Sequence, residues 1–237
     1  LQAMWRAKNK VGGKTVVIID ADGRQLDYNE MLRASFALGS ALAKLTEKGE
    51  KVAVLLPTGA GSGIAFFALN TYGRIPAMLN FTAGAKAIKA ACRAAQATNI
   101  VTAHKFIELG GLEELEGQLK QDHEMIYLED VRENISLGDK VRAVLGPIFP
   151  DLVATRVSPD DTAVILFTSG TEGDPKGVAL SHMNLVANVE QARAHVDILP
   201  TDIVFNSLPT FHSFGLTGGL LLPLFVGIPA VLHPSTL

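Results

Sequence analysis

The sequence predicts an α/β protein with mainly parallel strands. Short apolar runs alternate with segments of helical periodicity along most of the 237 residues, the pattern typical of parallel sheets with crossover helices. Hydrophobic residues make up 48% and charged residues 19% of the chain, so it is globular rather than disordered. The length is compatible with one or two domains.

Strands and helices are expected in strict alternation in the first half. Asp27 and Glu30 have the spacing of a capping box, so a helix is expected to begin there and to end before Lys48-Gly49. The expected strands are VVIID (16–20), KVAVLLP (51–57), PAMLN (76–80) and NIVTA (99–103), and the expected helices are about 28–45, 64–73 and 84–96.

The middle of the chain, about 108–150, is more polar. It contains one expected helix, GGLEELEGQLK, and ends in GPIFPD (146–151), which is interpreted as a loop joining two units. The apolar run DTAVILF then predicts a strand, followed by a glycine-rich loop, the helix SHMNLVANVEQARAH and the strand DIVFNSLP.

Charge and cysteine content exclude several classes of protein. A net charge near −3 gives no reason to expect a nucleic acid partner. Cys92 is the single cysteine, lies in a helical stretch and is expected to be a buried structural thiol in a reducing, intracellular setting. No signal peptide is visible near the first residues.

Residues 214–232 form an uncharged segment of nearly the length that spans a bilayer. Its four glycines and two prolines favour a buried helix, a turn and a buried strand instead. Peripheral association with a membrane stays open at this point.

Gly59-Ala-Gly-Ser-Gly63 follows an expected strand and suggests a dinucleotide-binding turn. The fingerprint GxGxxG needs a glycine at position 64, which is Ile64, and no acidic residue follows about 20 positions later. A tight turn from strand to helix is therefore the better interpretation.

The loop TSGTEGDPKG (168–177) has the composition of a phosphate-binding site. Its glycines allow backbone N–H groups to converge on one point, its hydroxyls add donors, and Lys176 adds a positive charge. Pro175 stands where a Walker A loop has glycine, so it is a different kind of loop. The alternative is an ordinary surface loop.

ILFTSGTEGDPKGVALSH resembles the phosphate-binding signature of the AMP-forming adenylation enzymes, the superfamily of acyl-CoA synthetases, luciferases and peptide-synthetase adenylation domains. Three further elements of that superfamily are resembled, in the right order, by LDYNEM, ALNTYGRIPAMLN and SLPTFHSFGLTGG. The resemblance therefore covers nearly the whole chain. Glu172, where most members have Thr or Ser, resembles the synthetase part of bacterial 2-acylglycerophosphoethanolamine acyltransferase/acyl-ACP synthetases.

This resemblance implies an ATP-dependent activation of a fatty acid through acyl-AMP, followed by transfer to a phosphopantetheine thiol of acyl carrier protein or coenzyme A. ATP and Mg²⁺ are the implied cofactors. The nucleotide would be held by Thr168, Ser169, Gly170, Thr171, Glu172, Gly173, Lys176 and Gly177. Either Glu172 turns outward, or it meets a basic partner elsewhere.

The resemblance also implies that His212 lies near the acyl carboxylate. The pocket would be walled by Phe211, Phe214 and the apolar segment that starts at Gly215. Without the surrounding PTFHSFG, a core histidine would be the default interpretation. His182 is expected to orient the start of the following helix. His104, His123, His195 and His233 show no metal-ligand spacing.

The implied fold consists of two adjacent, mainly parallel sheets with flanking helices, the second sheet being incomplete. Residues 50–196 would form one subdomain, and residues 1–49 with 197–237 parts of the other. Family members continue for roughly another 250–300 residues beyond the position of Leu237, so the fragment is expected to be inactive alone. The full protein is expected in the cytoplasm, at the inner face of a bacterial membrane, where it would serve lysophospholipid reacylation through a separate acyltransferase domain.

Two other functions remain alternatives from the sequence. One is an acyl-CoA ligase or aryl-acid adenylating ligase, and the other is a noncatalytic phosphate-binding α/β module.

Overall fold

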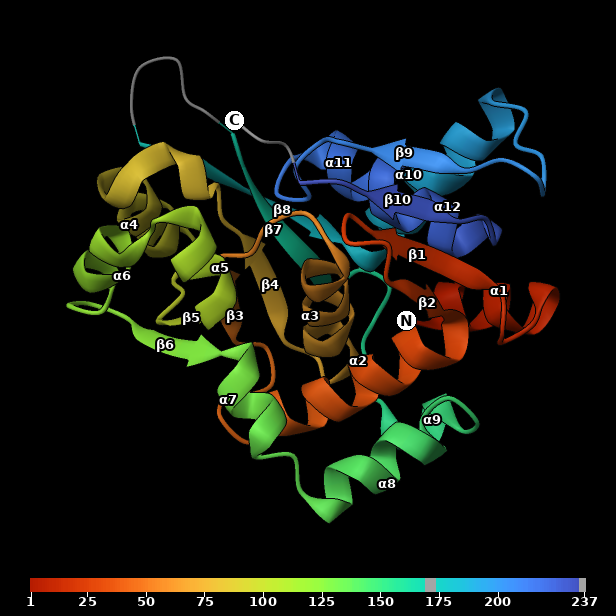
Figure 1. Ribbon diagram of the computed structural model, residues 1–237, viewed down its shortest axis with the longest axis horizontal. Helices are drawn as coiled ribbons and strands as arrows, with labels where there is room; N and C mark the ends of the chain where they lie inside the picture. Colours follow the sequence, from red (N-terminus) through yellow and green to blue (C-terminus); the bar gives the residue numbers. More distant parts are fainter. Residues whose placement is uncertain (169–173, 235–237) are drawn as a thin grey trace.

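The computed structural model describes residues 1–168 and 174–234 as two β-sheets surrounded by helices (Figure 1). The helices are α1 (Gln2–Val11), α2 (Tyr28–Leu42), α3 (Ala60–Thr71), α4 (Gly84–Ala95), α5 (His104–Gly110), α6 (Glu113–Leu119), α7 (Leu128–Glu133), α8 (Leu137–Leu145), α9 (Pro150–Val153), α10 (His182–His195), α11 (Ser213–Leu216) and α12 (Leu222–Val226). A 3₁₀ turn, η1 (Phe81–Ala83), and a π-helical turn, η2 (Thr217–Leu221), complete them.

The larger sheet has six strands in the order β6-β5-β3-β4-β7-β8. All neighbours are parallel except β7 and β8, which form an antiparallel pair. The strands are β3 (Lys51–Val54), β4 (Ile75–Met78), β5 (Asn99–Thr102), β6 (Glu124–Tyr127), β7 (Thr162–Thr168) and β8 (Lys176–Ser181).

The smaller sheet has four strands in the order β2-β1-β10-β9 and brings distant parts of the chain together. β1 (Val16–Asp20) pairs in parallel with β10 (Ala230–Leu232), which pairs in parallel with β9 (Val204–Asn206). β2 (Gln25–Asp27) is antiparallel to β1. The predicted fold class, two adjacent and mainly parallel sheets with flanking helices, is confirmed.

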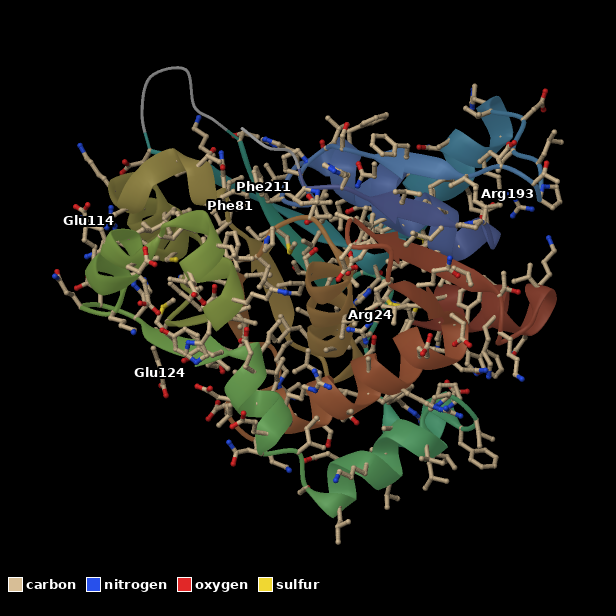
Figure 2. The ribbon with its side chains drawn as sticks, in the orientation of Figure 1. Arg24, Phe81, Glu114, Glu124, Arg193 and Phe211 are labelled. Atoms are coloured by element: carbon tan, nitrogen blue, oxygen red, sulfur yellow. The ribbon has the colours of Figure 1, made fainter. Side chains whose placement is uncertain are left out.

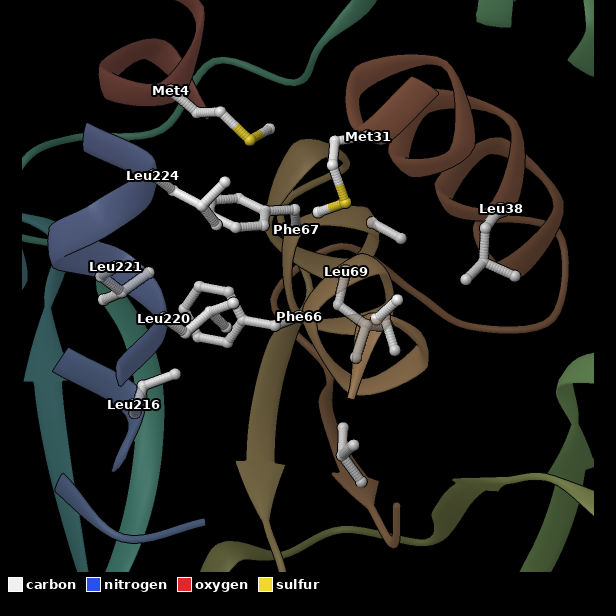
Figure 3. Close-up of a cluster of buried hydrophobic side chains, with 14 of the residues drawn as sticks. Met4, Met31, Leu38, Phe66, Phe67, Leu69, Leu216, Leu220, Leu221 and Leu224 are labelled. Carbon is white, nitrogen blue, oxygen red and sulfur yellow. The ribbon is translucent and has the colours of Figure 1, made fainter. Parts of the chain in front are cut away.

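Helix α3 lies at the centre of the main hydrophobic core. Figure 3 shows Phe66 and Phe67 of α3 facing Leu220 and Leu224 on one side, while Met31 of α2 covers the other side; all five side chains are buried. A Cβ at Gly39 of α2 would lie 2.4 Å from the backbone oxygen of Ala68, so the glycine permits the close approach of α2 to α3.

The predicted start of the first long helix is confirmed. The side chain of Asp27 accepts from the N–H of Glu30, and the Glu30 carboxylate accepts from the N–H of Asp27. The helix ends at Leu42 rather than near residue 45, since the chain turns at Ala43. Cys92 is a buried thiol as predicted, and burial raises its pKa to about 11.

Other boundaries were wrong. The expected joining loop at 146–151 includes the start of α9, because Pro150 occupies the first turn of that helix, where no N–H donor is needed. No strand was expected between the glycine loop and α10, but β8 lies there and pairs with β7. The strand expected over 202–209 is limited to Val204–Asn206, where it pairs with β10.

The uncharged segment 214–232 folds into α11, η2, α12 and the buried strand β10, which confirms the prediction of helix, turn and strand. Within residues 1–168 and 174–234, no helix combines the length and the apolar character that crossing a bilayer requires.

Candidate functional site

The ends of the glycine-rich loop form a β-hairpin. Thr168, the last residue of β7, is the register partner of Lys176, the first residue of β8, and both are exposed. A Cβ at Gly177 would lie 3.2 Å from Cγ2 of Ile165. The other predicted residues of the phosphate loop, Ser169, Gly170, Thr171, Glu172 and Gly173, lie outside the described residues.

β7 ends and β8 begins at the carboxyl edge of the larger sheet. Ligands of open α/β sheets bind at this edge. Ala77 of β4 is the register partner of Ile165 of β7, and the two strands are parallel. Asn80 and Thr168 each follow three residues later. The chain after β4 and the start of the hairpin therefore lie at the same edge.

An aromatic cluster connects this edge to the loop that carries His212. The ring of Phe81 in η1 makes edge-to-face contacts with Phe106 at 5.1 Å and with Phe211 at 5.4 Å between centroids. Phe211 is buried, and Figure 2 shows it next to Phe81. Edge-to-face pairs of this kind contribute beyond simple burial, so the cluster fixes the position of the residue before His212.

His212 is the N-cap residue of α11, and its N–H donates to the backbone oxygen of Pro209 at 3.0 Å. Its imidazole is exposed and tilted against Phe211, with 4.7 Å between ring centroids. Phe214 on α11 is 72% exposed, whereas Gly215 is buried. The structure thus brings His212 and Phe211 into contact and leaves Phe214 at the surface.

Small polar residues hold the His212 loop against the start of α3. The hydroxyl of Thr58 accepts from the N–H of Thr210 at 3.1 Å and donates to the oxygen of Leu208 at 3.3 Å. The Thr210 hydroxyl donates to the Ser62 hydroxyl at 3.3 Å. These three hydroxyl side chains are buried, where a hydrogen-bonded network specifies one arrangement.

Asn206 fixes the other end of the same loop. Its amide donates to the oxygen of Gly215 at 3.2 Å and its oxygen accepts from the N–H of Leu208 at 3.1 Å. A Cβ at Gly219 would lie 2.1 Å from the Asn206 amide. Gly219 belongs to the π-helical turn η2, a distortion that is frequent at functional sites.

Sequence reasoning missed the polar residues Thr58, Ser62, Asn206 and Thr210. Their signal was present, because each follows or lies close to the end of an apolar run that predicts a strand. The sequence analysis assigned roles to the glycines that follow Thr58 and to His212, two residues after Thr210, and gave none to these polar residues.

The turn at Gly59 connects strand to helix, as predicted. Gly59 is the N-cap residue of α3, and the N–H of Ala60 donates to Oδ1 of Asp20 in the other sheet at 2.8 Å. Burial raises the pKa of Asp20. A side-chain oxygen therefore already occupies the amino end of α3, a position that can otherwise bind an anion.

Among the remaining histidines, His104 follows β5 and so lies at the carboxyl edge of the larger sheet, whereas His182 lies elsewhere. His182 is the first residue of α10, where Ser181 provides the cap, and burial lowers its pKa. It lines a separate groove of about 710 Å³ between α1, α3, α10 and α12. His104 stacks on Tyr127 at 3.8 Å. Among the described residues, no three His, Cys, Asp or Glu side chains form a metal-binding group.

The pattern of the AMP-binding enzyme family matches residues 4–237, so this chain belongs to that family. Curated relatives include 4-coumarate--CoA ligase 1 of Petroselinum crispum, which is 27% identical over 226 residues, 93% of this chain and 40% of the relative. The chain thus spans about two fifths of that relative's length.

A second relative, the medium-chain-fatty-acid--[acyl-carrier-protein] ligase JamA of Moorena producens, is 26% identical over 212 residues, 86% of this chain and 33% of its own length. Among solved structures, VinN with 3-methylaspartate has a TM-score of 0.80 at 22% identity, covering 98% of this chain and 60% of VinN. The o-succinylbenzoate CoA synthetase of Bacillus subtilis with its acyl-adenylate has a TM-score of 0.78 at 20% identity, with 98% and 55% covered. At these identities the two structures establish the fold.

Proposed function

We propose that this chain is part of an ATP-dependent, AMP-forming ligase that activates a fatty acid and loads it onto a phosphopantetheine thiol. The observation that supports this most is the shared edge: the hairpin places Thr168 opposite Lys176, and Phe81 with Phe211 connects the same edge to His212. Open α/β sheets bind ligands at this edge.

In the proposed reaction, a carboxylate oxygen attacks the α-phosphorus of ATP and the bond to the pyrophosphate leaving group breaks. A thiol then attacks the acyl carbon and AMP leaves. Lys176, Thr168, the backbone at Gly177 and residues 169–173 would stabilise the charge of the β- and γ-phosphates, with Mg²⁺ accompanying the triphosphate. The family membership supports the use of ATP, and one similar solved structure contains AMP.

The acid would lie beside His212, in a pocket bounded by Phe211, Phe214 and the segment that begins at Gly215. The imidazole is exposed and held next to a buried ring, so it can donate to a carboxylate without first being uncovered. Because the hydroxyl network holds the loop, the backbone of His212 would already be in position when the acid binds.

A fatty acid and acyl carrier protein are the proposed substrate and acceptor. The medium-chain-fatty-acid--[acyl-carrier-protein] ligase TtuA of Teredinibacter turnerae is 41% identical over 75 residues, 30% of this chain and 11% of its own length. In the full protein, a separate acyltransferase domain would pass the acyl group to a lysophospholipid at the inner face of a bacterial membrane.

A coenzyme A ligase for aromatic acids is the second candidate. Over most of the chain, the similarity is to 4-coumarate--CoA ligase 1 and to a 4-hydroxybenzoate--CoA/benzoate--CoA ligase of Rhodopseudomonas palustris at 26% identity. Both candidates would use the same hairpin and would differ in the acid and in the acceptor thiol. Since the chain covers two fifths of the first relative, residues 1–237 alone are not expected to form acyl-AMP.

Acid-dependent exchange of pyrophosphate into ATP by the full protein tests the proposal. Lys176→Ala should lower kcat/KM for ATP about a hundredfold, the usual loss for one charge-stabilising group. Lys105→Ala, which removes an exposed lysine of α5, is the matched control and should leave exchange unchanged. Equal exchange by wild type and Lys176→Ala would contradict the phosphate role.

Two further comparisons separate the candidates. A fatty acid should support exchange better than 4-coumarate, and acyl carrier protein should accept the acyl group in preference to coenzyme A. The reverse preference would favour the aromatic-acid ligase. Absence of exchange with either acid would favour a noncatalytic phosphate-binding module.

A further inference from the structure

Thr58 lies in the short connection between β3 and α3, yet its side chain holds a distant part of the chain. A hydroxyl at a helix start usually accepts from the free N–H groups of that helix. Here the N-cap residue of α3 is Gly59, and the N–H of Ala60 donates to Asp20 instead. The hydroxyl of Thr58 is therefore free for partners outside α3.

That hydroxyl bridges the two backbone groups on either side of Pro209. Its oxygen accepts from the N–H of Thr210 at 3.1 Å, and it donates to the backbone oxygen of Leu208 at 3.3 Å. Thr58 and Thr210 are only 5% and 1% exposed. Because a buried backbone group without a partner costs free energy, this one side-chain atom determines how the chain passes through the turn.

The turn at Pro209 leads directly to His212. The backbone oxygen of Pro209 accepts from the N–H of His212 at 3.0 Å. Helix α11 packs against the same turn, since a Cβ at Gly215 would lie 2.2 Å from that oxygen. The Thr58 hydroxyl and α11 together restrict the backbone that carries the imidazole.

Thr58 also connects the two halves of the proposed site. It follows β3, which pairs with β4, and β4 pairs with β7, the first strand of the phosphate hairpin. The His212 loop follows β9 of the smaller sheet. The contact of Phe81 with Phe211 joins the same two parts through apolar surface, which is not directional. The hydrogen bonds of Thr58 add a direction, because they weaken steeply when misaligned.

We propose that Thr58 is a positioning residue of the ligase reaction proposed for this chain, and the role depends on that reaction. Its hydroxyl holds the His212 loop where the carboxylate of the acid meets the nucleotide. The carboxylate oxygen has to approach the α-phosphorus closely and in line, and a small displacement of either substrate lowers the rate strongly. Loss of the hydroxyl should weaken the use of the acid and leave the binding of ATP at the hairpin intact.

Pyrophosphate exchange by the full protein, with the acid and ATP varied separately, tests this role. Thr58→Val has nearly the shape of threonine but no hydroxyl. It should raise the KM for the acid about tenfold and leave the KM for ATP within about twofold of wild type. Thr58→Ser keeps the hydroxyl and should restore the KM for the acid to within about twofold of wild type. Partial unfolding would lower the amount of active protein without raising either KM.

Thr71→Val is the matched control. Thr71 is also a buried threonine of α3, but its hydroxyl donates to the backbone oxygen of Phe67 in the same helix. This variant should lower the thermal unfolding midpoint and change neither KM. Thr58→Ala is a second variant, in case Thr58→Val does not fold, and should raise the KM for the acid in the same way.

Hydrogen exchange of the full protein gives a readout besides activity, because the amide of Thr210 should exchange faster in Thr58→Val than in wild type or Thr71→Val. The positioning role is overturned if Thr58→Val keeps the wild-type KM for the acid, or if Thr71→Val raises that KM equally. In both cases the exchange of the wild type leaves the proposed function standing. A wild type without acid-dependent exchange would overturn the function and the role together.

Discussion

At the scale of single residues, Gly215 determines how the His212 loop can run. A Cβ there would lie 2.2 Å from the backbone oxygen of Pro209, a distance that no real side chain tolerates. The same oxygen accepts from the N–H of His212. Any larger residue at 215 therefore has to displace the backbone that positions the imidazole.

Gly215→Ala should destabilise the protein by about 1–3 kcal/mol, the range for overpacking a well-packed site. Urea unfolding followed by circular dichroism measures this. Gly61→Ala is the control, since a Cβ at Gly61 in α3 meets no atom within 4 Å. It should stabilise the protein by about 0.5–1 kcal/mol because alanine restricts the unfolded chain. Equal effects of the two substitutions would refute the close approach.

At the scale of elements, one buried carboxylate joins α8 to α2. Burial by itself would raise the pKa of Asp139, but hydrogen bonds from Lys44, Ser40 and Ser136 outweigh it and hold the pKa below its ordinary value. A carboxylate with a depressed pKa stabilises the folded state above its unfolded pKa, and that contribution is lost as the pH falls through the folded value.

Asp139→Asn should lower the free energy of unfolding at pH 7 by about 2 kcal/mol, as expected for hydrogen bonds to a charged group. The difference from wild type should shrink as the pH falls below about 4, because the carboxylate becomes protonated in the wild type too. Denaturant titrations over this pH range check it. Asp160→Asn, at an exposed position, should behave like wild type at every pH.

Alternation of apolar runs and helical periodicity predicted most of the central elements, since β3, β4 and β5 with α3 and α4 each follow from local pattern alone. β8 was not predicted, because KGVALS follows the glycine loop directly and becomes a strand through its pairing with β7. α8 was overlooked within a segment interpreted as polar, since its buried residue is an aspartate and its apolar residues face outward.

At the scale of the whole molecule, Phe81 connects the two hydrophobic clusters. It packs against the cluster that contains the α3 phenylalanines and against the cluster behind α4, which contains Ile88 and Leu55. Its ring contacts Phe106 near one sheet and Phe211 on the loop that follows the other. The two sheets therefore share a side chain at the edge proposed to bind substrate.

Phe81→Ala should lower the free energy of unfolding by about 2–3 kcal/mol, somewhat less than for a fully buried aromatic because Phe81 is half-buried. Hydrogen exchange should also accelerate at the amide of Thr210, whose loop loses its support. Phe205→Ala, at a 65% exposed position of β9, should change stability by less than about 0.5 kcal/mol. Unaltered exchange at Thr210 would show that Phe81 does not hold the loop.

The candidate site was only partly predictable from sequence. The composition of TSGTEGDPKG indicated a phosphate loop, and the structure describes its ends at Thr168 and Lys176. The hydrogen bond between Thr58 and Thr210 joins residues more than 150 positions apart in the chain. It depends on how the two sheets pack, so no local sequence pattern predicts it. The contact of Phe81 with Phe211 has the same origin.

The cap of α3 by Asp20 bears on how a nucleotide would be oriented. Helix α3 starts after β3 at the carboxyl edge of the larger sheet, and the N–H of Ala60 there already donates to Asp20 of the neighbouring sheet. At the proposed site, a polyphosphate would meet less attraction on the α3 side than beside the ammonium of Lys176. In the proposed site, this difference between the α3 side and the Lys176 side would give an incoming phosphate tail a preferred direction.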